Sequence, residues 1–472
     1  MRRLVRRMIV NTCLILAVGV GSIGSMPKSA EAKVSVLSQA ACVMDVQSGA
    51  VLYDKNMNDQ HYPASITKIM TTLVALENSS LSEQIEYTDA AYTNWESQAS
   101  NIEVQAGEKI SMEESLYAVM LSSANEVCNG VGIHVAGSID GFVDKMNERA
   151  KSLGCKNTHF VNPNGLWHKN HYTTPYDMAL IGREAMQNED FRTIAASKIY
   201  YMSKTNKREK GYPLVNHHKM LNPGAYPQFG YEYCVGGKTG YTLKSRNTLV
   251  TFAKKGDVEL VCVVMRCDGA VWQDQNAYTD TTKLLNHCFE NYKKVPIQDD
   301  TVSDINEQYL FTNFSPFYSK DTSSLHIDED AGIMLPKGVG VEKTEKKVEF
   351  YPEAQTQDGK KIIGRLSYTY EGKEVGATNI YFDESNAPTL KDSIDMSKWF
   401  DEAVETANKE PFPWKKFFLV LILVVCVVGV SIVCVIKVRG YEIRTRGRRS
   451  YRRHRRQMYN RDRAFYTKRR RF

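Results

Sequence analysis

Residues of alternating polarity predict β-strands at both ends of the segment 33–294. Two short runs near its start are separated by Gln47-Ser48-Gly49, a turn sequence that predicts a hairpin. Further strands are expected near its end, the last two of them joined across Lys255-Gly256-Asp257. The predicted strands cover residues 41–46, 50–54, 233–238, 247–254 and 258–266.

The region between these strands follows helical spacing. Ile66, Ile69 and Leu73 recur at the interval of one helix face, which predicts a helix over 65–77. Residues 80–195 read mostly as helix and loop, and another helix is expected over 272–292. Strands at both extremities with helices between them predict one α+β domain over residues 33–294, with a sheet assembled from the two ends of the segment.

Beyond residue 294 the pattern changes to short alternating runs. They are clearest at 346–351, 361–370 and 377–382. We expect them to form a separate small all-β domain over residues 295–385. Residues 386–416 follow as an expected amphipathic helical stalk.

Two uncharged, mostly apolar runs predict export and membrane anchoring. The first follows four arginines and leads to Ala30-Glu31-Ala32, the small-x-small pattern of a signal peptidase site, so residues 1–32 are expected to be a signal peptide; an uncleaved anchor is the alternative. The second, residues 417–436, is about 20 residues long, which is enough to cross a bilayer as one helix. Residues 437–472 carry 16 Lys and Arg against two acidic residues. This asymmetry predicts a single-pass cell-membrane protein with a cytoplasmic tail and an extracytoplasmic catalytic part.

The charge and the cysteines exclude several classes of function. The net charge of +7 comes from the two ends of the chain, while the segment between them is acidic. Anionic lipid headgroups beside the predicted span would satisfy the basic tail, so we expect no nucleic-acid partner. Seven of the ten cysteines lie outside both apolar runs, without Cys-x-x-Cys or Cys/His spacing, so no metal site, redox centre or other cofactor is predicted. Most are expected to be small core residues, and a disulfide among them stays open.

The candidate chemistry begins at Ser65-Ile66-Thr67-Lys68. A serine hydroxyl attacks poorly unless a base removes its proton, and a lysine three residues later on the same helix lies within reach of it. Pro63 favours a helix start just before Ser65, which would turn the Ser65 amide toward an oxyanion. The pattern alone is weak, because Ser25 to Lys28 repeats it in the predicted signal peptide.

Two further motifs follow in order. They are Ser123-Ala124-Asn125 and Lys238-Thr239-Gly240, the latter at the end of a predicted strand. The ordered set Ser-x-x-Lys, Ser-x-Asn and Lys-Thr-Gly is the active-site set of penicillin-binding proteins and serine β-lactamases. The chain resembles D-alanyl-D-alanine carboxypeptidases further, in residues 45–70, 162–166 and 174–179 and in the β domain before the membrane. It departs from many of them in Gly236-Gly237, where Asp-Gly is common, and in a full transmembrane span.

This resemblance implies both the fold and the reaction. It implies a DD-peptidase-like sheet flanked by helices, plus a small C-terminal all-β domain and one transmembrane helix. It implies a serine-type D-alanyl-D-alanine carboxypeptidase of the low-molecular-mass penicillin-binding type. Such an enzyme removes the terminal D-alanine from peptidoglycan stem peptides through an acyl-Ser65 intermediate, and β-lactams acylate it.

Each motif residue then has an expected role. Ser65 is the nucleophile, Lys68 the base with a lowered pKa, and Ser123 a proton relay to the leaving amine. In substrate binding, Asn125 contacts the peptide backbone, Lys238 and Thr239 hold the terminal carboxylate, Gly240 allows close approach, and the Tyr241 amide completes the oxyanion hole with that of Ser65.

Two other functions share these motifs. A class A β-lactamase needs a glutamate positioned to activate the deacylating water, and we expect no Glu-x-x-x-Asn of this kind between the second and third motifs. A non-catalytic wall-binding scaffold would keep the fold and lose the activity. His168 and His171 are interpreted as loop residues lining the cleft, and Glu126 as a surface or supporting carboxylate.

Overall fold

The computed structural model describes residues 34–94, 96, 99–269, 275–297, 325–357 and 360–382. All of them belong to one compact unit of the chain. The expected signal peptide (1–32), stalk (386–416), membrane span (417–436) and basic tail (437–472) lie outside the described residues, so these assignments stay predictions.

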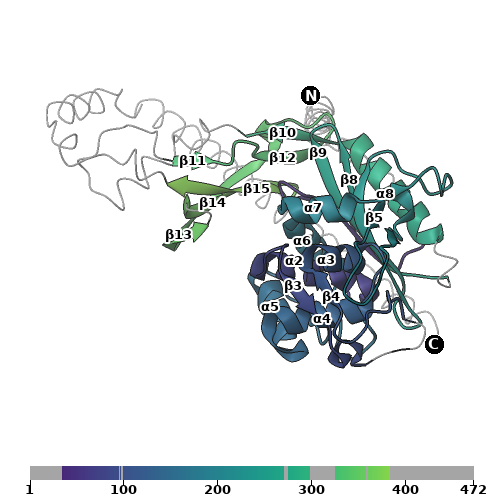
Figure 1. The fold of residues 1–472 in the computed structure, drawn as a ribbon. Helices are drawn as coiled ribbons and strands as arrows, with labels where there is room; N and C mark the ends of the chain where they lie inside the picture. Colours follow the sequence, from purple (N-terminus) through teal and green to yellow (C-terminus); the bar gives the residue numbers. More distant parts are fainter. Residues whose placement is uncertain are drawn as a thin grey trace, which may run out of the picture. The chain divides into compact units, whose positions relative to one another are not determined.

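A five-stranded antiparallel sheet is the centre of the fold, with the strand order β2-β1-β9-β8-β7 (Figure 1). The hairpin of β1 and β2 turns through Gly49, whose φ of 73° favours glycine. Strand β1 pairs with β9, which confirms that the sheet is assembled from the two ends of this segment; the sequence did not indicate which strands pair. The strands are β1 Ala40–Asp45, β2 Val51–Lys55, β7 Cys234–Thr242, β8 Arg246–Lys255 and β9 Val258–Cys267.

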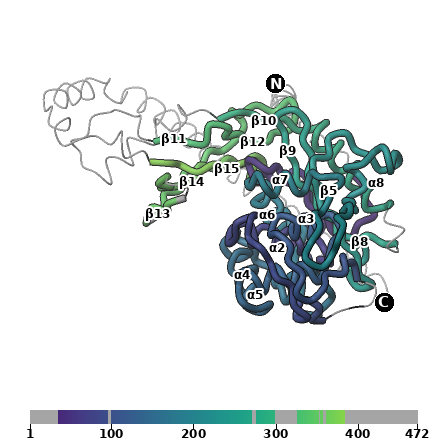
Figure 2. The backbone as a smooth tube through the Cα atoms, in the orientation of Figure 1, coloured from purple at the N-terminus to yellow at the C-terminus, as the bar shows by residue number. Residues whose placement is uncertain are grey.

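Both faces of this sheet are buried, because nearly all positions of its central strands β1, β8 and β9 are buried, whichever face they point to. In β9, Val261 and Val263 pack into one core, whereas Cys262 and Val264 pack into another on the opposite face. Helices α2 to α7 belong to the first face and α8 to the second, and Figure 2 shows α2, α4 and α5 gathered apart from α8. The helices are α2 Lys68–Asn78, α3 Met112–Met120, α4 Asn125–Ala136, α5 Ile139–Ser152, α6 Pro175–Ala185, α7 Glu189–Ala196 and α8 Gln275–Asn291.

Two predictions about element boundaries were wrong. Ser65 lies on a separate 3-10 turn, η1 Ala64–Thr67, and the α-helix begins only at Lys68. Strand β7 continues through the Lys-Thr-Gly motif to Thr242, because β8 pairs with it along this whole length. The motif is therefore held inside a sheet rather than at a free strand end.

Two short hairpins lie outside the main sheet. Strand β3 (Gln84–Glu86) pairs with β4 (Lys109–Ser111), and β5 (Ile199–Tyr201) pairs with β6 (Pro213–Val215). The loop within each hairpin is long, and the two loops contact each other near the site described below.

The remaining strands form two small antiparallel sheets with the orders β10-β12 and β11-β15-β14-β13. Their apolar residues form a third core that includes Ile333, Leu366 and Ile380. The predicted runs at 346–351, 361–370 and 377–382 lie within β13, β14 and β15. Strand β10 runs across residue 294, where the sequence suggested a boundary. The strands are β10 Tyr292–Pro296, β11 Leu325–Ile327, β12 Gly332–Pro336, β13 Glu345–Gln357, β14 Lys360–Tyr370 and β15 Lys373–Phe382.

The seven cysteines in the described residues are free thiols, and five of them are buried. Burial raises the pKa of Cys128 to about 11, so at neutral pH it is a protonated core residue.

Candidate active site

Ser65 is presented by a strained turn. Ala64, which directly precedes it, has a φ of 54°, a left-handed conformation that is uncommon for residues other than glycine. Thr248 on β8 stabilises this turn, because its hydroxyl donates to the Pro63 carbonyl at 2.8 Å. The Ser65 side chain is half-buried, while its neighbours Ile66 and Thr67 are fully buried. Ser65 is therefore a partly exposed residue of an otherwise buried turn.

Lys68, three residues after this serine, is fully buried. Its Nζ donates to Ser65 Oγ at 3.0 Å, to Asn125 Oδ1 at 2.8 Å and to the Asn164 carbonyl at 2.5 Å. Burial lowers the pKa of Lys68, because the charged form has lost its water. The first and second sequence motifs thus meet at one amine.

Ser123 and Asn125 lie at the junction of α3 and α4. Asn125 opens α4, and its Nδ2 donates to the Ser100 carbonyl at 2.9 Å, which turns its Oδ1 toward Lys68. Ser123 is buried and has a φ of 58°. Within the described part of the chain, its hydroxyl has no hydrogen-bond partner and makes no bond to Lys68.

The third motif approaches Ser65 along β7. A Cβ added to Gly240 would lie 2.9 Å from the Ser65 amide nitrogen and 2.4 Å from Thr248 Oγ1, so only glycine fits at this position. Lys238 is buried, and its pKa lies well below the ordinary value because of burial and then of the Lys68 charge. Thr239 and Tyr241, on either side of Gly240 in β7, are both half-buried.

The segment 162–166 is a part of the site to which the sequence assigned no role. Besides the Asn164 carbonyl bound by Lys68, the Pro163 carbonyl accepts a 2.5 Å hydrogen bond from Thr71. Gly165 has a φ of 84°, and a Cβ there would lie 2.0 Å from the Ala64 carbonyl oxygen. The likeness of this segment to carboxypeptidases was the only available signal, because main-chain carbonyls have no residue signature.

The histidine near this segment is structural. His171 is buried, and burial lowers its pKa to about 3. Its Nδ1 accepts from the Val161 amide, so the neutral ring carries its proton on Nε2 and donates to Thr67 Oγ1 at 2.9 Å. His171 thus ties the loop to the serine turn rather than acting as a base.

The structure places two carboxylates that the sequence left open or misjudged. Of the two interpretations of Glu126, the supporting one fits, because Glu126 is buried and its Oε1 accepts from the Ile102 amide at 2.7 Å. The spacing Glu-x-x-x-Asn does occur between the second and third motifs, at Glu184 and Asn188. Glu184 is paired with Arg149 at 2.5 Å and Asn188 caps α7, so the spacing here serves local structure.

The described residues contain no cluster of three or more His, Cys, Asp or Glu side chains that could hold a metal ion.

Comparison with known proteins identifies the family. The model of the family described as D-alanyl-D-alanine carboxypeptidase matches residues 26–269, more than half of the chain. The chain belongs to this family. It is thus a serine-type D-alanyl-D-alanine carboxypeptidase, as the motifs predicted.

The similar proteins show how far the likeness extends. D-alanyl-D-alanine carboxypeptidase DacF of Bacillus subtilis is 32% identical over 265 residues, which cover 55% of this chain and 64% of that enzyme. The crystal structure of a D-alanyl-D-alanine carboxypeptidase from Mycobacterium tuberculosis is 28% identical, with a TM-score of 0.50, over 57% of this chain and 96% of that one. Penicillin binding protein 5 of Haemophilus influenzae is 22% identical and shares the fold over 74% of this chain and 97% of its own, with a TM-score of 0.55.

No helix among the described residues is long and apolar enough to cross a membrane. The predicted span at 417–436 lies outside them.

Proposed function

We propose that this carboxypeptidase cleaves the terminal D-alanine from peptidoglycan stem peptides through an ester of Ser65, and that β-lactams acylate the same hydroxyl. The observation that carries the proposal is the Lys68 amine, which is buried and 3.0 Å from Ser65 Oγ. Family membership supports the substrate class.

The surroundings of Lys68 suit a neutral base. A neutral amine has two N–H groups and one lone pair. The Asn125 and Asn164 oxygens accept the two N–H groups, which leaves the lone pair for the Ser65 hydroxyl. Burial lowers the pKa of Lys68 and so favours this neutral form.

Acylation then proceeds with a balanced proton transfer. Ser65 Oγ attacks the carbonyl carbon of the scissile peptide bond while its proton passes to Lys68 Nζ. The tetrahedral intermediate collapses, the C–N bond breaks, and the proton moves from Lys68 through Ser123 to the departing D-alanine amine. Ser123 has a free hydroxyl for this relay within the described part of the chain. Water then hydrolyses the Ser65 ester and restores the serine.

The third motif stabilises charge in the substrate. The amides of Ser65 and Tyr241 bind the oxyanion, and the close approach of Gly240 to the Ser65 amide supports this pairing. The half-buried Thr239 hydroxyl binds the terminal carboxylate, with Lys238 behind it as the counter-charge. The arriving carboxylate favours the ammonium form of Lys238 that burial disfavours, so recognition and protonation are coupled.

A Ser65→Ala variant tests the nucleophile. We expect it to release no D-alanine from diacetyl-Lys-D-Ala-D-Ala, by mass analysis, and to take no label from a fluorescent penicillin, while unfolding at the wild-type temperature. Labelling that persists in the folded variant would identify another nucleophile. Rapid release of hydrolysed penicillin by the wild type would instead indicate a β-lactamase, and no reaction a scaffold.

We also propose a membrane topology. An N-terminal signal exports the chain, residues 417–436 anchor it in the cell membrane, and the basic tail stays in the cytoplasm. The length of the apolar run and the charge of residues 437–472 support this arrangement.

A further inference from the structure

The orientation of Asn125 depends on a segment that no motif includes. We call residues 100–108, which lead into β4, the strap. Both the Asn125 amide nitrogen and its Nδ2 donate to the Ser100 carbonyl, at 3.0 and 2.9 Å. These two bonds fix the Asn125 side chain, and they leave its Oδ1 free to accept from Lys68.

A further hydrogen bond joins the strap to α4 at Glu126, the residue that follows Asn125. The Ile102 amide donates to Glu126 Oε1 at 2.7 Å, and the side chain of Glu126 is buried. Ile102 and Val104 also pack into the core beside α4. A shift of the strap would therefore move the first turn of α4 and the amide of Asn125.

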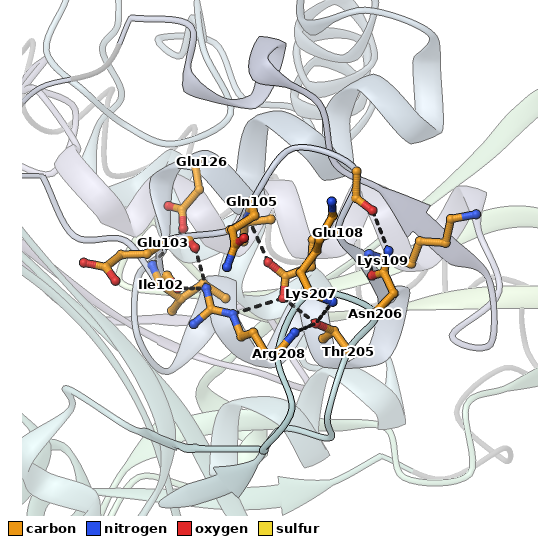
Figure 3. Close-up of polar contacts among 12 residues, drawn as sticks. Ile102, Glu103, Gln105, Glu108, Lys109, Glu126, Thr205, Asn206, Lys207 and Arg208 are labelled. Atoms are coloured by element: carbon orange, nitrogen blue, oxygen red, sulfur yellow. Dashed lines mark hydrogen bonds and ion pairs between the residues drawn. The ribbon is translucent and has the colours of Figure 1, made fainter.

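Residues of the β5–β6 hairpin loop, Arg208 above all, hold the strap through hydrogen bonds (Figure 3). Arg208 Nη2 donates to the Ile102 carbonyl at 2.7 Å and to the Glu103 carbonyl, and Arg208 Nε donates to Glu108 Oε1 at 3.0 Å. One planar guanidinium thus holds the middle and the end of the strap together.

The acceptor of this clamp is a fully buried carboxylate. Glu108 also accepts from Thr205 Oγ1 at 2.7 Å and from the Gln105 amide at 2.8 Å. A buried carboxylate without its cation is unfavourable, because its lost hydration is not replaced. Removing Arg208 would deprive the buried Glu108 carboxylate of its cation and would release two strap carbonyls.

We propose that Arg208 is a positioning residue of this carboxypeptidase: through the strap it sets the orientation of Asn125, and Asn125 in turn holds the Lys68 amine against Ser65. The assignment rests on the proposed acyl-Ser65 mechanism. Arg208 lies outside all three motifs, on a hairpin 83 residues beyond Asn125 in the sequence.

The test compares three variants of the full chain by the second-order rate of labelling with a fluorescent penicillin. Coupling through a packed network is worth 0.5–2 kcal/mol in general, so Arg208→Ala should label on the order of tenfold more slowly. The labelling rate of Arg208→Lys should lie between those of the wild type and Arg208→Ala, because an ammonium can pair with Glu108 but cannot also reach both carbonyls. Lys210→Ala removes the same charge from an exposed position of the same hairpin and should label at the wild-type rate.

A double-variant cycle separates positioning from general damage. If Arg208 acts through Asn125, Arg208→Ala should change the labelling rate by less than about twofold in an Asn125→Ala background, because the two effects share one route. Multiplying effects in the double variant, or an unchanged rate in Arg208→Ala alone, would overturn the proposal. If Arg208→Ala does not fold, the same cycle is measured with Arg208→Lys in its place, and the same two outcomes support or overturn the proposal.

Hydrogen exchange gives a second readout on the folded protein. Arg208→Ala should speed exchange of the Ile102 amide and leave the strands β8 and β9 unchanged; equal protection of Ile102 in both proteins would contradict the clamp. Failure of the acyl-Ser65 mechanism is distinguishable, because the wild type would then take no label, or Ser65→Ala would keep it.

Discussion

At the scale of single residues, two buried lysines with different numbers of polar partners distinguish this site. Lys68 has three acceptors around it, whereas within the described residues Lys238 donates to the Thr239 carbonyl alone, at 3.2 Å. Burial lowers the pKa of both, and the charge of Lys68 lowers that of Lys238 further. The fold therefore holds Lys238 at a cost in stability, which is the usual compromise at a binding site.

The cost can be measured through Lys238→Met, which keeps the length of the side chain. We expect this variant to be more stable than wild type by about 1 to 2 kcal/mol at pH 7. A lysine with a lowered folded-state pKa is protonated more in the unfolded chain, so its penalty decreases as pH rises toward the ordinary value of 10.5. The advantage of Lys238→Met should accordingly shrink by pH 10.

Denaturant unfolding at the two pH values provides the measurement. Lys244→Met, at an exposed position after β7, is the matched control and should change neither stability nor its pH dependence. An advantage for Lys238→Met that is the same at both pH values would show that packing, not ionisation, causes it.

At the scale of elements, the serine turn depends on contact with a second loop. Thr248 donates to the Pro63 carbonyl from below, and Gly165 lies against the Ala64 carbonyl from the side. These contacts keep Ala64 in its left-handed conformation and explain why Ser65 lies on a 3-10 turn although its sequence continues the helical spacing of α2. Local propensity is overridden here by tertiary packing.

Gly165→Ala tests this dependence, with Gly154→Ala as its matched control. Both glycines have positive φ, 84° and 82°, so each substitution costs about 1 kcal/mol from backbone strain. Only Gly165 has an obstacle, the Ala64 carbonyl oxygen at 2.0 Å, while a Cβ at Gly154 meets nothing within 4 Å. The free energy of unfolding of Gly165→Ala should therefore be lower than that of Gly154→Ala by at least about 2 kcal/mol, because an added methyl group overpacks this site.

Thermal unfolding and penicillin labelling of the two variants check this expectation. We expect Gly154→Ala to label Ser65 at the wild-type rate and Gly165→Ala to label it slowly even at temperatures where it is folded. Equal stability and equal labelling of both variants would show that the 162–166 loop does not support the serine turn.

At the scale of the whole molecule, the distribution of charge argues for a fixed orientation in the membrane. The segment between the two apolar runs is acidic, whereas residues 437–472 carry 16 basic residues. A short, strongly basic segment resists translocation across the membrane, so it should remain inside while the acidic part is exported.

Protease added to intact spheroplasts tests this orientation. It should remove the domain that bears Ser65 and spare an epitope placed after Phe472. Loss of the epitope from intact cells would overturn the assignment. A chain that ends at Glu410 should be secreted in soluble form and should label with penicillin as the full chain does.

By itself the sequence determined the reaction class, the five-stranded sheet from two distant segments and the residues of three motifs. These follow from side-chain chemistry and from apolar periodicity, which are local properties of the chain. Only the tertiary structure decided that Glu126 is buried, that the Asn164 carbonyl completes the surroundings of Lys68, and that Arg208 holds the strap. Main-chain carbonyls are the same in every residue, and burial is a property of what packs against a side chain. No pattern within one segment of the chain can therefore indicate them.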